Sequence, residues 1–197
     1  LAGKPVVAVI TSMAQPLGTH IGNALEVKDA IDVLAGRTQG DLLEISLLLG
    51  SHMLVLAEKA KTLPEARAML ENALSSGAGL RKLAEMIAAQ GGDPRVVEDL
   101  SLLPQAAVKR VMRAETAGYL SAMDTTALGM AAQRMGAGRA KKSDMLDYSV
   151  GYVLHVRLGD EVTEDTPLAT LYARNEAEAE EAEKAIRKAL TIAKEKP

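Results

Sequence analysis

Two carboxylates and a run of turn-forming residues near the start of the chain are the residues best placed to do chemistry. Glu26 and Asp29 are three positions apart, so both would lie near one face of a helix. Pro16, Gly18 and Gly22 precede this predicted helix and set a tight backbone path. Main-chain carbonyls released by such a loop, together with a carboxylate, are ligands that a hard cation prefers. The alternative is a plain strand-to-helix connection, and the local residues taken alone favour this simpler interpretation.

The loop would be positioned by a strand before it and a helix after it. Residues 6–10 (VVAVI) form a continuous apolar run, typical of a strand buried on both faces of a parallel sheet. Asn23 stands at an N-cap position and Glu26 completes a capping box, which predicts a helix from Asn23 to about Leu34. Ligands of open α/β sheets bind at the carboxyl ends of strands, where residues 11–15 would lie. This position modestly favours a functional loop.

The pattern of the remaining residues predicts helices first and then a mixture of helices and strands. Helices are predicted over residues 41–59, 63–75 and 79–89, and a connector over residues 93–104. Beyond it the pattern predicts strands at 107–112, 118–122, 150–158 and 168–172, and helices at 125–135 and 175–196. The segment GDEVTEDTPLATL (residues 159–171) resembles the hairpins of biotinyl- and lipoyl-type barrel-sandwich modules. No lysine stands at a hairpin tip, so we interpret it as architecture.

Composition excludes several kinds of chemistry. The formal net charge is −3 with scattered Lys and Arg, which predicts no nucleic-acid partner and no attraction to an anionic membrane. Cysteine is absent, so disulfides, thiol catalysis and thiolate metal sites are excluded within these 197 residues. The three histidines are isolated in sequence, which argues against a Ser/His/Asp triad and a zinc site. The glycine clusters at residues 77–79, 91–92 and 136–138 are weak phosphate-loop candidates, and we interpret them as helix ends and turns.

Longer segments of the sequence point to a more specific hypothesis about the family. The string QPLGTHIGNALEVKDAI (residues 15–31) resembles the signature of pyrimidine-nucleoside phosphorylases and thymidine phosphorylases. The segments LGSHM, LAEKA, AAQGGD, GAGRAKKSD and VGYVLHVRLGDEV follow in the order found in that family. The resemblance implies an α/β (α+β) chain in two parts. Residues 1–104 would be the C-terminal part of the catalytic α/β domain, and residues 105–197 a small barrel-sandwich-like α+β domain.

The resemblance also implies an activity for a longer parent protein. Such enzymes convert phosphate and a pyrimidine nucleoside into the free base and a pentose 1-phosphate. Their phosphate cradle and pyrimidine-binding Arg, Ser and Lys lie in the N-terminal half, and nothing in this sequence matches those motifs. We therefore assign no catalytic or substrate-binding residue here, and we predict that the isolated chain is inactive. The chain starts at Leu1 and close to a predicted strand, so we interpret it as a piece of a longer protein.

A cation site is the one site that the resemblance places in this chain. It implies potassium or another hard cation, held by the main-chain carbonyls of Leu17 and His20 and by the carboxylate of Asp29. The remaining ligands would come from outside the chain, and no organic cofactor is implied. His20 replaces a smaller residue of the family, which a main-chain ligand tolerates. Asp29 stands where the family commonly has the longer Glu, so a bridging water is an alternative to direct coordination.

Two other functions stay open from the sequence. One is an AMP phosphorylase-type enzyme, which has a similar loop, and the other is a non-enzymatic barrel-sandwich interaction module. For the leading hypothesis we expect phosphate and a pyrimidine nucleoside as partners of the parent, which would be a cytoplasmic homodimer with no membrane association.

Overall fold

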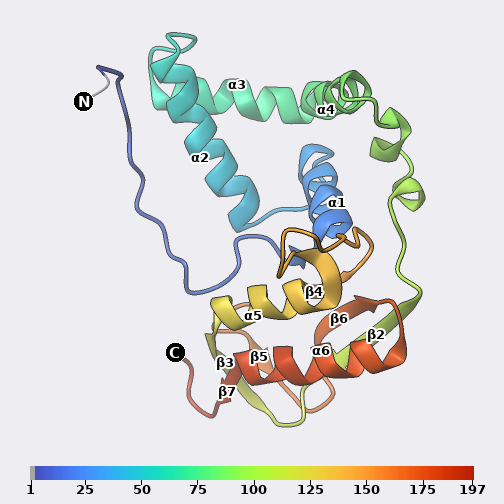
Figure 1. Cartoon of the computed structure of the whole chain (residues 1–197). Helices are drawn as coiled ribbons and strands as arrows, with labels where there is room; N and C mark the ends of the chain where they lie inside the picture. Colours follow the sequence, from blue (N-terminus) through green and yellow to red (C-terminus); the bar gives the residue numbers. More distant parts are fainter. Residues whose placement is uncertain (1–2) are drawn as a thin grey trace. The chain divides into compact units, whose positions relative to one another are not determined.

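The computed structural model describes residues 3–197, which form two compact units (Figure 1). The first unit contains the residues up to Thr11 together with residues 30–102. The second contains residues 12–29 and 103–197, so two stretches far apart in the sequence build it. The predicted domains, residues 1–104 and 105–197, stay a prediction.

The first unit is helical. Helix α1 (Asn23–Leu34) starts in the second unit and ends in the first, where it is followed by α2 (Asp41–Leu56), α3 (Leu63–Ser75) and α4 (Ala78–Ala89). The short 3-10 turns η1 (Pro94–Val97) and η2 (Leu100–Leu102) complete the unit. Val33, Leu43 and Leu47 form its small buried cluster. Thr62 caps α3 by accepting a hydrogen bond from the Glu65 amide, as expected for a Thr before a proline-containing first turn.

The strand predicted for residues 6–10 was wrong for this structure. The segment forms no regular element, and Val6 and Ile10 are 82% and 99% exposed. A strand buried on both faces needs neighbouring strands and a packed layer on each side. Neither sheet of the described structure includes this segment, and of its residues only Val9 is partly buried.

The second unit contains two open antiparallel sheets. The first has the strand order β1 (His20–Ile21), β4 (Gly151–Leu154), β6 (Pro167–Ala173) and β2 (Val108–Arg113). The second has the order β5 (Glu161–Val162), β3 (Gly118–Met123) and β7 (Leu190–Ala193). Helix α5 (Thr125–Ala132) continues into the π-helical turn η3 (Gln133–Ala137), and α6 (Glu176–Ala189) follows β6. The chain is therefore a mixed α and β structure, as predicted at that level.

A single core holds this second unit together. Side chains from both sheets and both helices meet in it, including the fully buried Leu120, Leu128, Tyr152, Leu171 and Ile186. The hydroxyl of Tyr152 donates to the Leu128 carbonyl oxygen at 2.8 Å, which satisfies the polar end of a buried ring. Burial raises the pKa of the Tyr152 hydroxyl, so it stays protonated as a donor.

Two predicted elements end differently in the structure. The strand predicted over residues 150–158 is regular only in β4, because the chain turns through residues 157–160 before β5. The helix predicted over 175–196 ends at Ala189, and the alternating residues Leu190 to Ala193 continue as β7 beside β3. Apolar and β-branched residues in alternation suit an edge strand better than a last helical turn.

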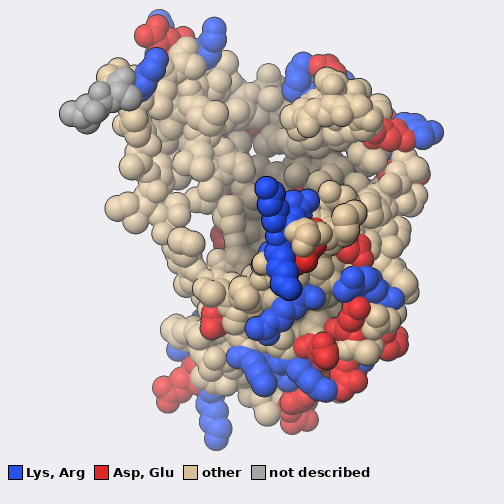
Figure 2. Space-filling model, in the orientation of Figure 1, with Lys and Arg blue, Asp and Glu red and all other residues tan. Residues whose placement is uncertain are grey.

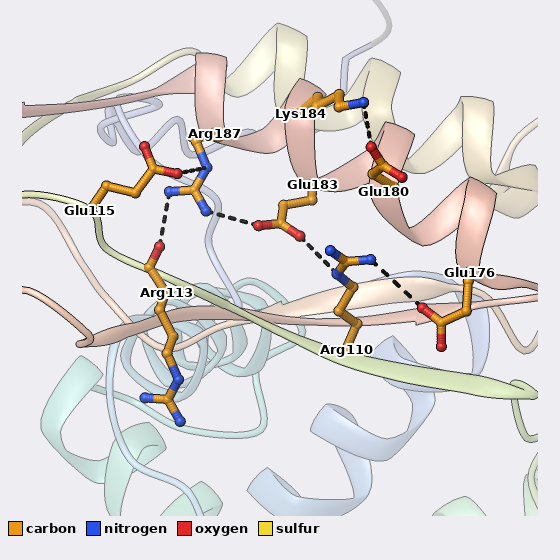
Figure 3. Close-up of polar contacts among 8 residues, drawn as sticks. All are labelled: Arg110, Arg113, Glu115, Glu176, Glu180, Glu183, Lys184 and Arg187. Atoms are coloured by element: carbon orange, nitrogen blue, oxygen red, sulfur yellow. Dashed lines mark hydrogen bonds and ion pairs between the residues drawn. The ribbon is translucent and has the colours of Figure 1, made fainter.

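Charged side chains attach α6 to its sheet. Glu183 accepts from Arg110 on β2 at 2.9 Å and from Arg187 one turn later at 2.9 Å (Figure 3). Arg187 also donates to the carbonyl oxygen of Arg113 at 2.9 Å. Figure 2 shows acidic and basic atoms intermixed on the part of this face where α6 lies in Figure 1. The charges of the last helix thus form a face on which acidic and basic side chains pair with one another.

Among residues 3–197, no helix is long and apolar enough to cross a membrane.

Candidate functional site

The candidate site is the loop and helix start between Ser12 and Asp29, all within the second unit. The loop lies along the segment that follows β4. Leu154 donates its amide to the Thr19 carbonyl oxygen at 2.8 Å, and Leu158 donates its amide to Oε1 of Gln15 at 2.9 Å. Together with the short strand β1, these bonds fix the path of the loop at both ends.

The start of α1 differs from the predicted capping box in one respect. Glu26 reaches back to the amide before the helix, with Oε1 3.3 Å from the Gly22 nitrogen, as the acidic half of a capping box does. Asn23, however, lies inside the first turn and donates from Nδ2 to the Ala137 carbonyl oxygen at 2.9 Å. Asn23 therefore joins the helix start to the turn after α5, and the prediction that it caps the helix was wrong.

Gly22 is required at the junction between loop and helix because the backbone of β4 approaches it closely. Gly22 has φ of 135°, and a Cβ there would lie 2.4 Å from the Val150 carbonyl oxygen. Its neighbour across the sheet, Gly151, has φ of 148°, and a Cβ there would lie 2.1 Å from the Ile21 carbonyl oxygen. Two glycines thus face each other where antiparallel strands approach most closely.

The structure brings two of the three predicted ligand residues together. His20 Nδ1 lies 3.4 Å from Oδ1 of Asp29, and the two side chains are 13% and 5% exposed. The hydroxyl of Thr19 lies 3.0 Å from the same imidazole nitrogen. Asp29 thus presents a nearly buried carboxylate on the first turns of α1, beside the strand that carries His20.

The register of β1 directs the carbonyl of His20. The strands pair His20 with Val153 and Ile21 with Tyr152, and the Leu154 amide donates to the Thr19 carbonyl oxygen immediately before these pairs. Hydrogen-bonded and non-hydrogen-bonded pairs alternate along an antiparallel ladder, so His20 occupies a non-hydrogen-bonded position. Its carbonyl therefore points away from β4, on the outer side of the sheet's edge strand. This orientation is the one that a main-chain cation ligand needs.

The third predicted residue, Leu17, has a different environment. Its carbonyl oxygen accepts from Nη2 of Arg157 at 3.4 Å, and the preceding Pro16 carbonyl accepts from Nη1 of the same guanidinium at 2.7 Å. A positive side chain thus lies against one carbonyl that the cation hypothesis uses. Sequence reasoning missed Arg157 because no local pattern links two residues 140 positions apart.

These residues fit a hard cation only in part. Two carbonyls and one carboxylate are oxygen ligands of the right kind, but Ca²⁺ takes six to eight. Within residues 3–197 no group of three or more His, Cys, Asp or Glu side chains could hold a metal ion. A complete site would therefore need ligands that the described residues do not supply.

The glycine clusters considered as phosphate loops lie at helix ends. Gly77, with φ of 70°, separates α3 from α4, and Gly91, with φ of 81°, follows α4. Gly136, with φ of 108°, lies in the η3 turn, where the Asp147 amide donates to its carbonyl at 3.0 Å. Each glycine serves a left-handed backbone position that ends a helix or turn.

Comparisons with known proteins agree with this arrangement. Residues 119–193, which run from β3 to β7, match the family described as pyrimidine nucleoside phosphorylase C-terminal domain. The chain is 49% identical over 174 residues to pyrimidine-nucleoside phosphorylase of Bacillus subtilis (strain 168), a match covering 88% of this chain and 40% of the relative. The corresponding protein of Geobacillus stearothermophilus is 48% identical over the same length. That of Staphylococcus aureus (strain USA300) is 43% identical over 191 residues, covering 97% of this chain and 44% of the relative.

The second unit thus contains a phosphorylase C-terminal domain, and the match extends through the first unit as well. Over almost its whole length the chain is similar to the C-terminal part of pyrimidine-nucleoside phosphorylases, and residues 119–193 match the C-terminal-domain family of these enzymes. It spans less than half the length of the curated relatives it matches.

Proposed function

We propose that this chain is the C-terminal portion of an enzyme that cleaves pyrimidine nucleosides with phosphate, giving the free base and a pentose 1-phosphate. The observation that carries the proposal is an identity of 43–49% extending over 88–97% of the chain. The two antiparallel sheets also support the predicted likeness to barrel-sandwich modules, and the turn between β5 and β6 connects one sheet to the other.

The chain alone is expected to be inactive. Catalysis of phosphoryl or glycosyl transfer depends on positioned groups that stabilise developing charge. The matched relatives extend well beyond the region aligned here, because the matches cover only 40–44% of their length. We infer that the exposed segment at residues 6–10 becomes a strand when the rest of such an enzyme is present, because its apolar side chains then gain neighbours.

A hard cation bound beside this loop is part of the same proposal. The carboxylate of Asp29 and the carbonyls of His20 and Leu17 are its ligands from this chain, and residues from the remainder of the enzyme complete the shell. The buried carboxylate and the outward His20 carbonyl support it. Potassium fits this oxygen-only set, and binding to the isolated chain is expected to be weak or absent. A tight potassium or calcium site in the isolated chain, measured by calorimetry, would count against this view.

The experiment that tests the function is complementation. The chain is produced together with the portion of the Bacillus subtilis relative that precedes the matched region, and release of uracil or thymine from the nucleoside is followed with and without phosphate. We expect phosphate-dependent release only when both pieces are present. Light scattering on the active mixture measures whether the complex is the homodimer expected for the parent.

A variant in the exposed segment makes the test specific. Ala8→Pro removes a backbone donor and should prevent strand formation, so we expect it to abolish complementation while leaving the fold of the isolated chain unchanged. Ala8→Ser is the matched control and should complement like the unaltered chain. Turnover by the isolated chain, or no turnover by a stable complex, would contradict the proposal.

A further inference from the structure

The loop that carries the candidate ligands is held by one long-range side chain. Nη1 of Arg157 donates to the Pro16 carbonyl oxygen at 2.7 Å, and Nη2 donates to the Leu17 carbonyl oxygen at 3.4 Å. The two carbonyls belong to successive peptide groups, so one planar guanidinium contacts both. Two parallel hydrogen bonds from one guanidinium fix the orientation of the loop as well as its distance from Arg157.

The backbone of Arg157 is itself fixed by a tight turn. Its amide donates to Oδ2 of Asp160 at 2.7 Å, and the Asp160 amide donates to its carbonyl oxygen at 3.1 Å. Gly159, with φ of 88°, provides the left-handed position that this turn requires. The side chain therefore extends from a backbone held by a turn, and the cost that remains for the contact is the rotamer entropy of the side chain itself.

We propose that Arg157 is a positioning residue for the candidate cation site: its guanidinium orients the Pro16 and Leu17 carbonyls. The proposal rests on the proposed function for its consequence, since the cation would bind the loop that Arg157 holds. The contact itself is a property of this chain and is measured without cation or partner.

A lysine at position 157 should hold the loop less firmly than the arginine does. An ammonium on a flexible stem donates as a point charge and cannot span two successive carbonyls in one plane. Arg157→Lys therefore keeps the charge and loses the two parallel hydrogen bonds, whereas Arg157→Met removes both and retains an unbranched apolar stem.

Amide hydrogen exchange provides the direct test. The Leu154 amide donates to the Thr19 carbonyl, and it is three residues away from the substitution, so its intrinsic exchange rate is unchanged. We expect exchange at Leu154 to become about tenfold faster in Arg157→Met, as expected for loss of a charged hydrogen bond. Arg157→Lys should give an intermediate rate. The Ala114 amide, which donates to Thr166 elsewhere in the unit, should be unaffected.

Arg113 offers a matched control. Its Nη1 donates to the Asp165 carbonyl oxygen at 2.7 Å, the same kind of bond at the same distance in the same unit. Arg113→Met should leave exchange at Leu154 within about twofold of the unaltered chain. Equal acceleration by both substitutions, or none by Arg157→Met, would overturn the proposal.

The second measurement uses the complemented enzyme. We expect Arg157→Met to raise the potassium concentration that gives half-maximal activity by about tenfold, with kcat at saturating potassium changed by less than about twofold. A fall in kcat alone would overturn the positioning role. Absence of activity in every combination, with the exchange result as expected, would support the role of Arg157 and count against the proposed function.

Discussion

The imidazole of His20 lies 3.4 Å from the carboxylate of Asp29, and both side chains are nearly buried at the start of α1. The two residues come from different elements, β1 and α1, so the contact fixes the helix against the edge strand. A buried carboxylate that loses its partner keeps the cost of leaving water. The pair thus contributes to stability as well as to the candidate site.

Removing the Asp29 carboxylate is therefore expected to weaken the second unit. Asp29→Asn should lower the free energy of unfolding by about 1–3 kcal/mol, because the nearly buried His20 loses the negative charge beside its ring. A double-mutant cycle with His20→Ala in urea unfolding measures the coupling, which we expect to be above about 0.5 kcal/mol. Strictly additive effects would show that the two side chains do not interact.

Gly151 is expected to tolerate no side chain. A Cβ at this position would lie 2.1 Å from the Ile21 carbonyl oxygen, so Gly151→Ala must displace β1 from β4. We expect a loss of more than about 3 kcal/mol in the free energy of unfolding. Gly159→Ala is the control, since its φ of 88° is also positive but its Cβ would contact only Lys196 at 3.9 Å. Gly159→Ala should lower the free energy of unfolding by only about 1–2 kcal/mol, through backbone strain. An equal loss of stability in the two variants would contradict the predicted clash at Gly151.

Glu183 is expected to be the most important charge in the α6 network. It accepts from Arg110 and Arg187 at 2.9 Å each and is 19% exposed (Figure 3). Glu183→Gln should lower the free energy of unfolding by about 1 kcal/mol, and by less at 1 M salt. Glu180→Gln removes an exposed carboxylate that pairs with Lys184 on the same helix, and it should have no measurable effect in thermal unfolding. A salt-independent loss at Glu183 would argue against an electrostatic cause.

His155 is expected to make stability depend on pH. Burial and the positive charge of Lys109 lower the pKa of the His155 imidazole below its usual value of 6.5. The unfolded chain then binds more protons than the folded chain, so stability falls as pH drops below about 6.5 toward the folded pKa. In His155→Gln the loss of stability between pH 7.5 and pH 5.5 should be smaller than in the unaltered chain. Thermal unfolding at the two values measures it, and an unchanged difference would exclude His155 as the cause.

Local patterns predicted most helices and the strands of the second unit because their signals are local. The helix at Leu63–Ser75 has a Thr cap, a first-turn proline and apolar periodicity within its own thirteen residues. The predictions were wrong where tertiary neighbours, and not the local sequence, determine the secondary structure. Residues 6–10 have strand-forming side chains but no strand beside them, and Leu190 to Ala193 leave the helix because β3 offers an edge.

The candidate site could be predicted only as far as its own loop. Pro16, the glycines and the carboxylates are adjacent in sequence, so turn chemistry and the resemblance located the segment. The groups that hold the loop, Arg157 and Leu158, come from the turn after β4, more than a hundred residues away. Register and long-range pairing determine such contacts, and a single sequence carries no local signal for them.

The division of the second unit into two sequence segments has a consequence for how the chain is made. Residues 12–29 leave the ribosome long before the residues that contact them. The hydrogen bond between Leu17 and Arg157 can form only after Arg157, 140 positions later, has been synthesised. Closing so long a loop is entropically costly and slow compared with forming the intervening helices. Helices α2 to α4 are therefore expected to form first, while the segment of residues 12–22 stays open until Arg157 has been synthesised.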